Sequence, residues 1–167
     1  MQGTRLVENT RIVIRDAIGG TGGLQTATNS VNMKYYNRCR IKLIVACNDA
    51  AVVGGAVTLK QGSTSTASTA LAFAEYWKNE DMLSAITSGD LTRVAASTLA
   101  AGVRNKTAMY IFEVKSDMLN NDTLGSENTY IRLDLADITT ATEAHTLIYE
   151  LYEPRYAAGA EDMPSFV

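Results

Sequence analysis

The segment at residues 38–47 constrains the fold most, because its side chains alternate between two kinds along ten consecutive positions. One set of alternate positions holds Cys39, Ile41, Leu43, Val45 and Cys47. The other set begins with Arg38, Arg40 and Lys42. A repeat of two is the period of a β-strand, in which successive side chains point to opposite faces. The segment therefore predicts a long strand with one buried and one solvated face, ended by the turn residues Asn48 and Asp49.

Further segments show similar strand patterns. They cover residues 10–15, 56–61, 69–77, 91–96, 107–115, 129–136 and 145–152. In the first of them, Ile12 and Ile14 take alternate positions, so we expect these two isoleucines to form its buried face. The spacers are rich in Gly, Asn, Asp, Ser and Thr, and no long helical pattern separates the strands. Residues 80–86 and 116–119 could each form only a turn or two of helix.

This succession of strands predicts an all-β fold: an antiparallel β-sandwich, jelly-roll-like, with about eight strands and little helix. A chain of 167 residues fits one domain that can bury its own core without a metal or a disulfide. We expect an N-terminal arm at residues 1–9, a β-sandwich domain at residues 10–156 and a C-terminal tail at residues 157–167. Pro154 should end the last strand, because proline has no N–H to donate to a ladder.

The charge balance limits the class of partner. The net charge is −3, so there is no basic excess to hold a polyanion, which argues against nucleic acid. The basic stripe of Arg38, Arg40 and Lys42 follows Tyr35 and Tyr36, a combination that could suit single-stranded nucleic acid. The overall acidity instead favours a solvated or salt-bridging strand face. No apolar run approaches the roughly 20 residues of a membrane helix, and no secretory signal follows the N-terminus, so we expect no membrane partner.

The residues that could carry chemistry do not form a recognisable site. The single histidine, His145, has no second His or Cys near it in sequence, and no Gly-x-Ser-x-Gly elbow offers a nucleophile, so we expect a strand-end polar residue. The glycine-rich residues 19–23 lack the Lys-Ser/Thr ending of a phosphate loop. Residues 117–127 lack the spacing of a calcium loop. The sequence therefore predicts no enzyme, no metal and no cofactor.

The two cysteines, Cys39 and Cys47, fall on the same strand. Eight residues along a strand span roughly 26 Å, far beyond the reach of a disulfide. We expect two buried free thiols that behave as small apolar groups, as in a protein that matures in a reducing cytosol. Burial in an apolar face raises a thiol pKa and makes the group inert, so a catalytic Cys–His pair is not expected.

Six short sequence segments, in order along the chain, resemble segments of a known protein family. They are MKYYNRC at 33–39, VTLKQ at 57–61, AFAEYW at 72–77, YIFEV at 110–114, YIRLDL at 130–135 and LYEPRYA at 151–157. Their order resembles the small head decoration, cement or minor capsid structural proteins that tailed bacteriophages encode beside the major capsid protein. The resemblance extends from about residue 4 to residue 157 and rests on strand-and-turn phrases. It brings no catalytic residues with it.

The resemblance implies a structural virion protein that binds the outside of a tailed-phage capsid and decorates or stabilises it. Its partner would be the major capsid protein, and it would form a homo-oligomer, a trimer or a dimer. It would be made in the cytoplasm of the host bacterium and end on the capsid surface. Two alternatives stay open: a tail or connector component of the virion, and a glycan-binding β-sandwich module. The second would use Trp77, the single tryptophan, with Tyr76 pointing to the opposite face.

If the chain is a capsid decoration protein, we expect its two terminal segments to bind the shell. The C-terminal tail shows no period yet keeps apolar groups that a solvated tail usually lacks. An arm that orders on binding can wrap a large surface at modest affinity per area. The candidate interface residues are Arg5, Val7, Tyr156, Met163, Phe166 and Val167.

Overall fold

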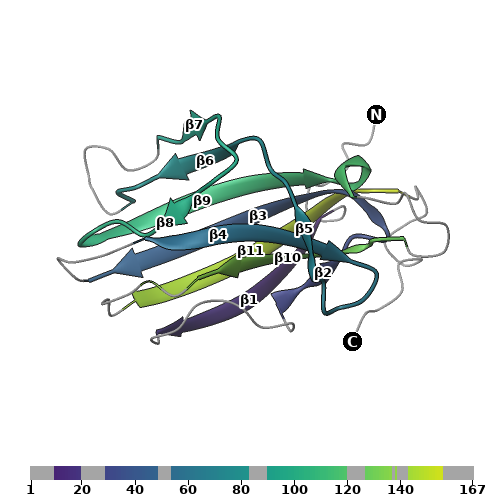
Figure 1. Cartoon of the computed structure of the whole chain (residues 1–167), viewed down its shortest axis with the longest axis horizontal. Coiled ribbons are helices and arrows are strands. Elements are labelled where there is room, and N and C mark those ends of the chain that lie inside the picture. Colours follow the sequence, from purple (N-terminus) through teal and green to yellow (C-terminus); the bar gives the residue numbers. More distant parts are fainter. Residues whose placement is uncertain are drawn as a thin grey trace, which may run out of the picture.

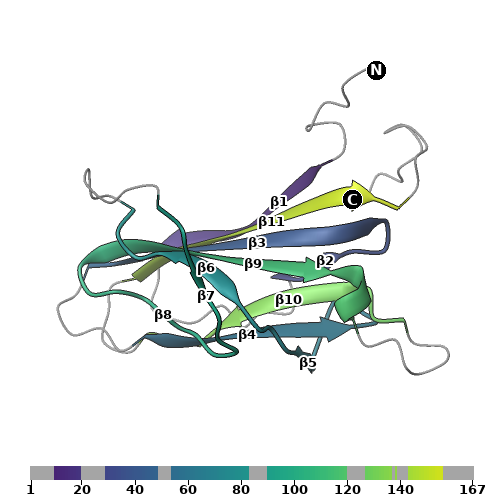
Figure 2. The same ribbon diagram turned by 90° about the horizontal axis from the view of Figure 1, so that it is seen from above.

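The computed structural model describes residues 10–19, 29–48, 54–82, 90–119, 127–136, 138 and 143–155. These residues form two antiparallel β-sheets that pack face to face (Figure 1), and Figure 2 shows the two layers from the side. The predicted all-β sandwich is confirmed.

The two sheets differ in size. The large sheet has the order β1 (Arg11–Gly19), β11 (Glu143–Pro154), β3 (Tyr36–Cys47), β9 (Lys106–Lys115), β6 (Tyr76–Asn79) and β7 (Thr92–Val94). The small sheet has the order β2 (Val31–Asn32), β10 (Tyr130–Leu135), β4 (Gly55–Gly62) and β5 (Thr69–Leu71), and β8 (Ala100–Ala101) also pairs with β4. Within the described part of the chain every strand pairing is antiparallel.

The described residues hold eleven strands, more than the sequence predicted. The expected strand at residues 69–77 is divided into β5 and β6, because the chain leaves the small sheet there and crosses to the large one. β2 and β8 have two residues each, too short for a periodic pattern to reveal. A 3-10 turn, η3 (Ser116–Met118), lies where a short helical turn was expected. Of the other expected turn only residues 80–82 are described, and they are not helical.

The strand pairs are nested along the chain. β3 pairs with β11, β4 pairs with β10, and β6 pairs with β9. Of these six strands, the first along the chain pairs with the last. The second pairs with the last but one, and the two middle strands pair with each other. This is the path of a long hairpin folded over on itself, the feature that makes a sandwich jelly-roll-like.

Strand β3 lies at the centre of the large sheet and supplies one side of the core. Its residues Cys39, Ile41, Leu43, Val45 and Cys47 are all fully buried, so the predicted dry face is confirmed. Both cysteines are buried free thiols, as expected. Burial raises the pKa of the Cys39 thiol well above its usual range, and the carboxylate of Glu150 adds to that shift.

The expected buried face of β1 is wrong. Ile12 and Ile14 are 60% and 63% exposed, whereas Val13 packs against the core. The reason is the pairing with β11: Val13 lies opposite Tyr149, whose side chain is fully buried, and Ile14 lies opposite Ile148. Because paired residues share a face of the sheet, the register places both isoleucines on the outside.

Two buried tyrosines connect the sheets. The backbone N–H of Leu133, in β10, donates to the Tyr149 hydroxyl of β11 at 2.9 Å. The N–H of Gly102, just after β8, donates to the Tyr110 hydroxyl of β9 at 3.1 Å. Both tyrosines belong to the large sheet. Their hydroxyls accept hydrogen bonds from backbone N–H groups of β10 and of the residue after β8, on the other side of the core. Hydrogen bonds as well as apolar packing therefore set the spacing of the layers.

Candidate functional site

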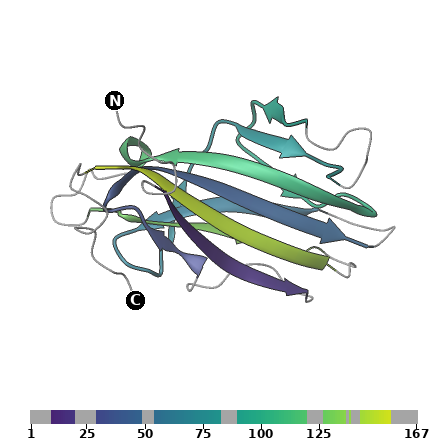
Figure 3. The same ribbon diagram turned by 180° about the vertical axis from the view of Figure 1, so that it is seen from behind.

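The outer face of the large sheet is the surface that turns away from the core. Figure 3 views the molecule from this side and shows β1, β11, β3 and β9 side by side. Among the residues that the structure describes, no strand or helix crosses over it. A sheet face of this width without a covering layer is a candidate interaction surface.

One row of side chains runs across this outer face from edge to edge. Successive strand registers join, in spatial order, Ile14, Ile148, Lys42, Ile111, Trp77 and Arg93. Apolar side chains thus stand on both sides of Lys42, and Arg93 ends the row at β7. We call this set the cross-strand row.

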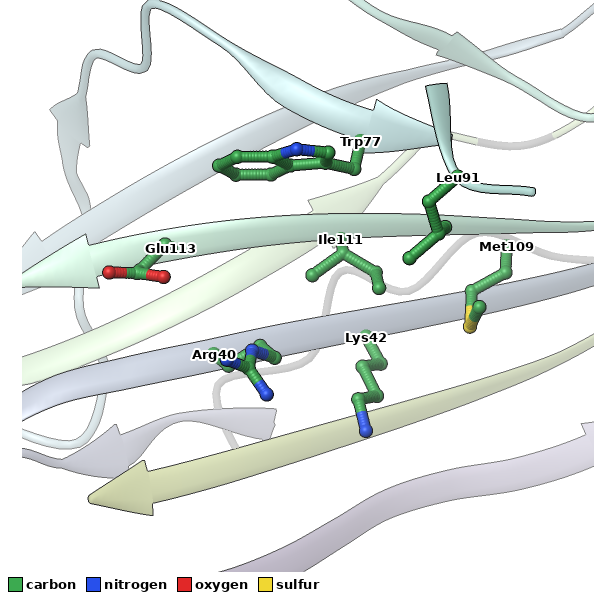
Figure 4. Close-up of a pocket in the computed structure, with 7 residues that line it drawn as sticks. All are labelled: Arg40, Lys42, Trp77, Leu91, Met109, Ile111 and Glu113. Carbon is green, nitrogen blue, oxygen red and sulfur yellow. The ribbon is translucent and has the colours of Figure 1, made fainter. Parts of the chain in front are cut away.

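A hollow lies on the row at the β9 and β6 end (Figure 4). Its volume is about 490 Å³. It is lined by Arg40, Lys42, Trp77, Leu91, Met109, Ile111 and Glu113. Figure 4 shows Ile111 near the middle, Trp77 and Leu91 along one side, and Arg40 and Lys42 along the other. The hollow is therefore apolar on one side and charged on the other.

The charged side chains of this face form two neighbouring sets of ion pairs, which together we call the ion-pair band. Its members are Arg38, Arg40, Lys42, Glu113, Glu150 and Glu153. Arg38 contacts Glu113 at 2.8 Å and Glu153 at 3.0 Å, while Glu150 lies 2.5 Å from the Lys42 Nζ and 3.5 Å from the Arg40 Nη1. The hydrogen bond with Glu113 raises the pKa of Arg38. Three cations face three carboxylates, so the band has no net charge.

The basic stripe seen in the sequence is therefore salt-bridged, as the overall acidity favoured. The tyrosines that precede it are not exposed platforms: Tyr36 is buried in the core, and Tyr35 is half-buried and packs against the core. The guanidinium of Arg40 instead lies 5.5 Å from the ring centroid of Tyr152 on the neighbouring strand. The combination that would suit single-stranded nucleic acid does not form here.

A second charged group lies on the small sheet and is buried. The Arg132 Nε lies 2.6 Å from one oxygen of Asp134, and Arg132 donates to the other oxygen at 3.0 Å. The Lys60 Nζ lies 2.8 Å from Asp134, and Arg132 also donates to the carbonyl oxygen of Thr66 at 3.1 Å. The strand pattern places Arg132 and Asp134 opposite the apolar face, yet both are buried, and the ion pair between them offsets part of the cost of removing their charges from water.

The other groups that could carry chemistry do not gather. His145 is the third residue of β11, is buried, and lies opposite Val45 in the sheet, so it is a core position rather than a strand end. Within the described ranges, no three His, Cys, Asp or Glu side chains come close enough to hold a metal ion. In the same ranges, no helix is long and apolar enough to cross a membrane. Residues 20–23 and 120–126, from the glycine-rich and acidic loops, lie outside them.

The interface residues predicted from the sequence lie outside the part of the chain that the structure describes. They are Arg5, Val7, Tyr156, Met163, Phe166 and Val167. The arm and tail predictions therefore stay predictions. The outer face of the large sheet was not predicted, because it depends on which residues of β1, β11, β9 and β6 stand beside β3. The exposed alternation of Arg38, Arg40 and Lys42 was the one local signal that pointed to it.

Comparison of the sequence with protein-family models and with curated proteins finds no match.

Proposed function

We propose that this chain is a structural virion protein that binds the outside of a tailed-phage capsid and decorates or stabilises it. The resemblance of its strand-and-turn phrases to head decoration proteins supports this role. The observation that carries the proposal is the outer face of the large sheet, which offers exposed isoleucines and an internally neutralised ion-pair band. Such a surface suits contact between proteins better than it suits catalysis. The role requires no catalytic group.

The direct test is binding to virion parts. Purified protein is mixed with empty, expanded heads and, separately, with tails of the phage that encodes it, and the bound fraction is separated by sedimentation. We expect saturation on heads at a fixed stoichiometry and a higher melting temperature of the decorated heads, because a ligand that binds only the intact shell stabilises it. Binding to tails without binding to heads would favour a tail or connector component instead.

The C-terminal tail gives a second test. A chain that ends at residue 156 should unfold at the same temperature as the full chain, because the described sandwich ends at Arg155. The same truncation should weaken binding to heads, where many copies multiply each small contact. A truncated chain that no longer folds would show that residues 157–167 belong to the core.

Glycan binding is a second candidate, favoured by the position of Trp77. Its indole lines the hollow together with the charged groups of Arg40, Lys42 and Glu113, and aromatic faces beside polar groups suit sugar rings. A glycan array should then give a signal that Trp77→Ala abolishes. A protein that binds heads and gives no glycan signal would reject this candidate.

A further inference from the structure

We propose that the outer face of the large sheet binds a second copy of this chain, in a two-fold dimer that seats Ile14 of each copy in the hollow of the other. The inference rests on the geometry of this face and not on the proposed capsid role. The chain would therefore form this dimer whether or not it binds a phage head.

The face carries both halves of a contact. Ile12 and Ile14 project from β1 with more than half of their surface exposed. Farther along the cross-strand row, Trp77 stands beside Ile111, which is only 9% exposed at the centre of the hollow, and Leu91 lines the hollow next to them. Ile14 and Ile111 lie at the same level along the strands, because Ile148 and Lys42 join them in register.

A two-fold axis brings these halves together. The strand order is β1, β11, β3 and β9, so an axis parallel to the strands between β11 and β3 places β1 of one copy over β9 of the other. An axis in this direction keeps each row at its own level, and Ile14 then lies over Ile111 of the second copy. Sheets that pack face to face in this way are about 10 Å apart and nearly aligned. The contact is isologous, since each copy offers the same patch.

The charges of the face fit the same arrangement. The row next to the cross-strand row joins Ile12, Glu150, Arg40 and Glu113. With the axis between β11 and β3, Glu150 of one copy faces Arg40 of the other, and the reverse pair forms by symmetry. The ion-pair band has no net charge, so it gives no preference for an acidic or a basic partner and does not repel its own kind. The same register places Ile148 over Lys42 and Ile12 over Glu113 of the other copy, so the contacts that favour a second copy are the two Glu150–Arg40 pairs and the seating of Ile14 in the hollow.

Sedimentation equilibrium over a range of concentrations measures the oligomer. We expect the chain to sediment as a reversible dimer, and the double variant Ile12→Thr with Ile14→Thr to raise the dissociation constant at least tenfold. Threonine keeps the strand preference while it removes most of the apolar contact. The matched control is Ala70→Thr, an exposed position on the small sheet, which should leave the dissociation constant unchanged.

Cross-linking tests the geometry directly. Ile14→Cys and Leu91→Cys proteins are mixed and treated with a short bis-maleimide, and Cys39 and Cys47 stay protected by burial. We expect a cross-linked dimer in the mixture, little from either variant alone, and none when Ala70→Cys replaces Leu91→Cys. In the proposed dimer two copies of Ile14 are separated sideways by roughly 15 Å, three strand spacings, and also by the gap between the sheets. Efficient cross-linking of Ile14→Cys to itself would mean that β1 edges pair instead, and would overturn the proposal.

The outcomes separate this inference from the proposed function. A chain that stays monomeric at every concentration, forms a trimer, or dimerises equally well with both isoleucines replaced would overturn the dimer. If a monomeric chain bound heads and lost that binding in the Ile12→Thr, Ile14→Thr variant, the outer face would meet the shell, and the capsid role would stand without the dimer. A dimer that binds no virion part would leave the inference intact and remove the proposed function.

Discussion

The hydroxyl of Tyr149 accepts a hydrogen bond from the backbone N–H of Leu133 at 2.9 Å, across the space between the two sheets. The N–H of Ala136 donates to Ala56 in β4, so the N–H of Leu133, three residues away, points to the opposite side of β10. On that side β2 pairs only with Tyr130 and Ile131. The tyrosine of the large sheet thus completes a ladder that the short strand leaves open.

Tyr149→Phe should therefore destabilise the fold. The change removes the acceptor and leaves the N–H of Leu133 buried without a partner, which costs about 1–3 kcal/mol. Chemical denaturation followed by circular dichroism measures the free energy of unfolding. Tyr130→Phe is the control, because Tyr130 is half-buried and its hydroxyl makes no hydrogen bond to the described residues, so its loss should cost much less. Equal effects of the two changes would contradict the role of Tyr149.

Stability should fall at high pH, in part through Tyr110. Burial raises the pKa of Tyr110 to about 12, and the N–H of Gly102 lowers it by less, whereas the unfolded chain has the ordinary value of 10.0. Between these two values the phenol loses its proton in the unfolded chain and keeps it in the folded chain. The contribution of Tyr110 to the free energy of unfolding is therefore fully present below pH 10 and is lost as the pH rises toward about 12. The slope from one such group is at most about 1.4 kcal/mol per pH unit. Tyr110→Phe should reduce the measured slope, and an unchanged slope would contradict this assignment.

The exposed isoleucines of β1 should tolerate replacement. In protein dilute enough to be monomeric, Ile14→Thr should change the free energy of unfolding by about 0.5 kcal/mol or less, because the side chain is already mostly in water. Leu43→Ala, on the buried face of β3, should cost about 2–5 kcal/mol through lost burial and a cavity. The comparison checks the face assignment of β1. A large loss at position 14 in dilute protein would place Ile14 in the core after all.

The buried group around Asp134 should be sensitive to the loss of one member. Asp134→Ala leaves the Arg132 guanidinium buried without its carboxylate, which costs about 3–5 kcal/mol. Replacing both partners, Arg132→Met with Asp134→Leu, should recover much of that loss, because both fully buried charges are then gone and the remaining ammonium of Lys60 is partly exposed. The exposed pair of Arg93 and Glu75 is the control, and Glu75→Ala should cost about 1 kcal/mol or less. A double variant as unstable as Asp134→Ala would show that shape, not charge, dominates at this site.

The thiols should be unreactive in the native protein. Cys39 and Cys47 are fully buried, and burial raises the pKa of Cys39, so neither the access nor the thiolate that a disulfide reagent needs is present. We expect 5,5′-dithiobis(2-nitrobenzoate) to react with both thiols only after denaturation. Fast reaction in native buffer would mean that β3 opens locally at its ends.

The sequence by itself determined where most strands lie, and for β3 it also determined which face is buried. That face is readable because its apolar and charged residues separate completely at a period of two, a property of the local chain. Alternation predicted the wrong face for β1, because Ile12, Val13 and Ile14 are all apolar and the flanking Arg11 and Arg15 favoured the positions of Arg11, Val13 and Arg15 as the solvated face. It also treated residues 69–77 as one strand, since nothing local shows that the chain changes sheets between Leu71 and Tyr76.

Only the tertiary structure decided which strands are neighbours and which side chains share a face of the sheet. Pairing with β11 turned Ile14 outward by placing Val13 opposite the buried Tyr149, and pairing with β9 and β6 brought Ile111 and Trp77 into the same row. These neighbours come from strands far apart in the sequence, and their registers depend on how the whole set of inner faces fills one core. Once the inner faces are buried together, the side chains that point the other way form the outer face. That outer face is the candidate surface.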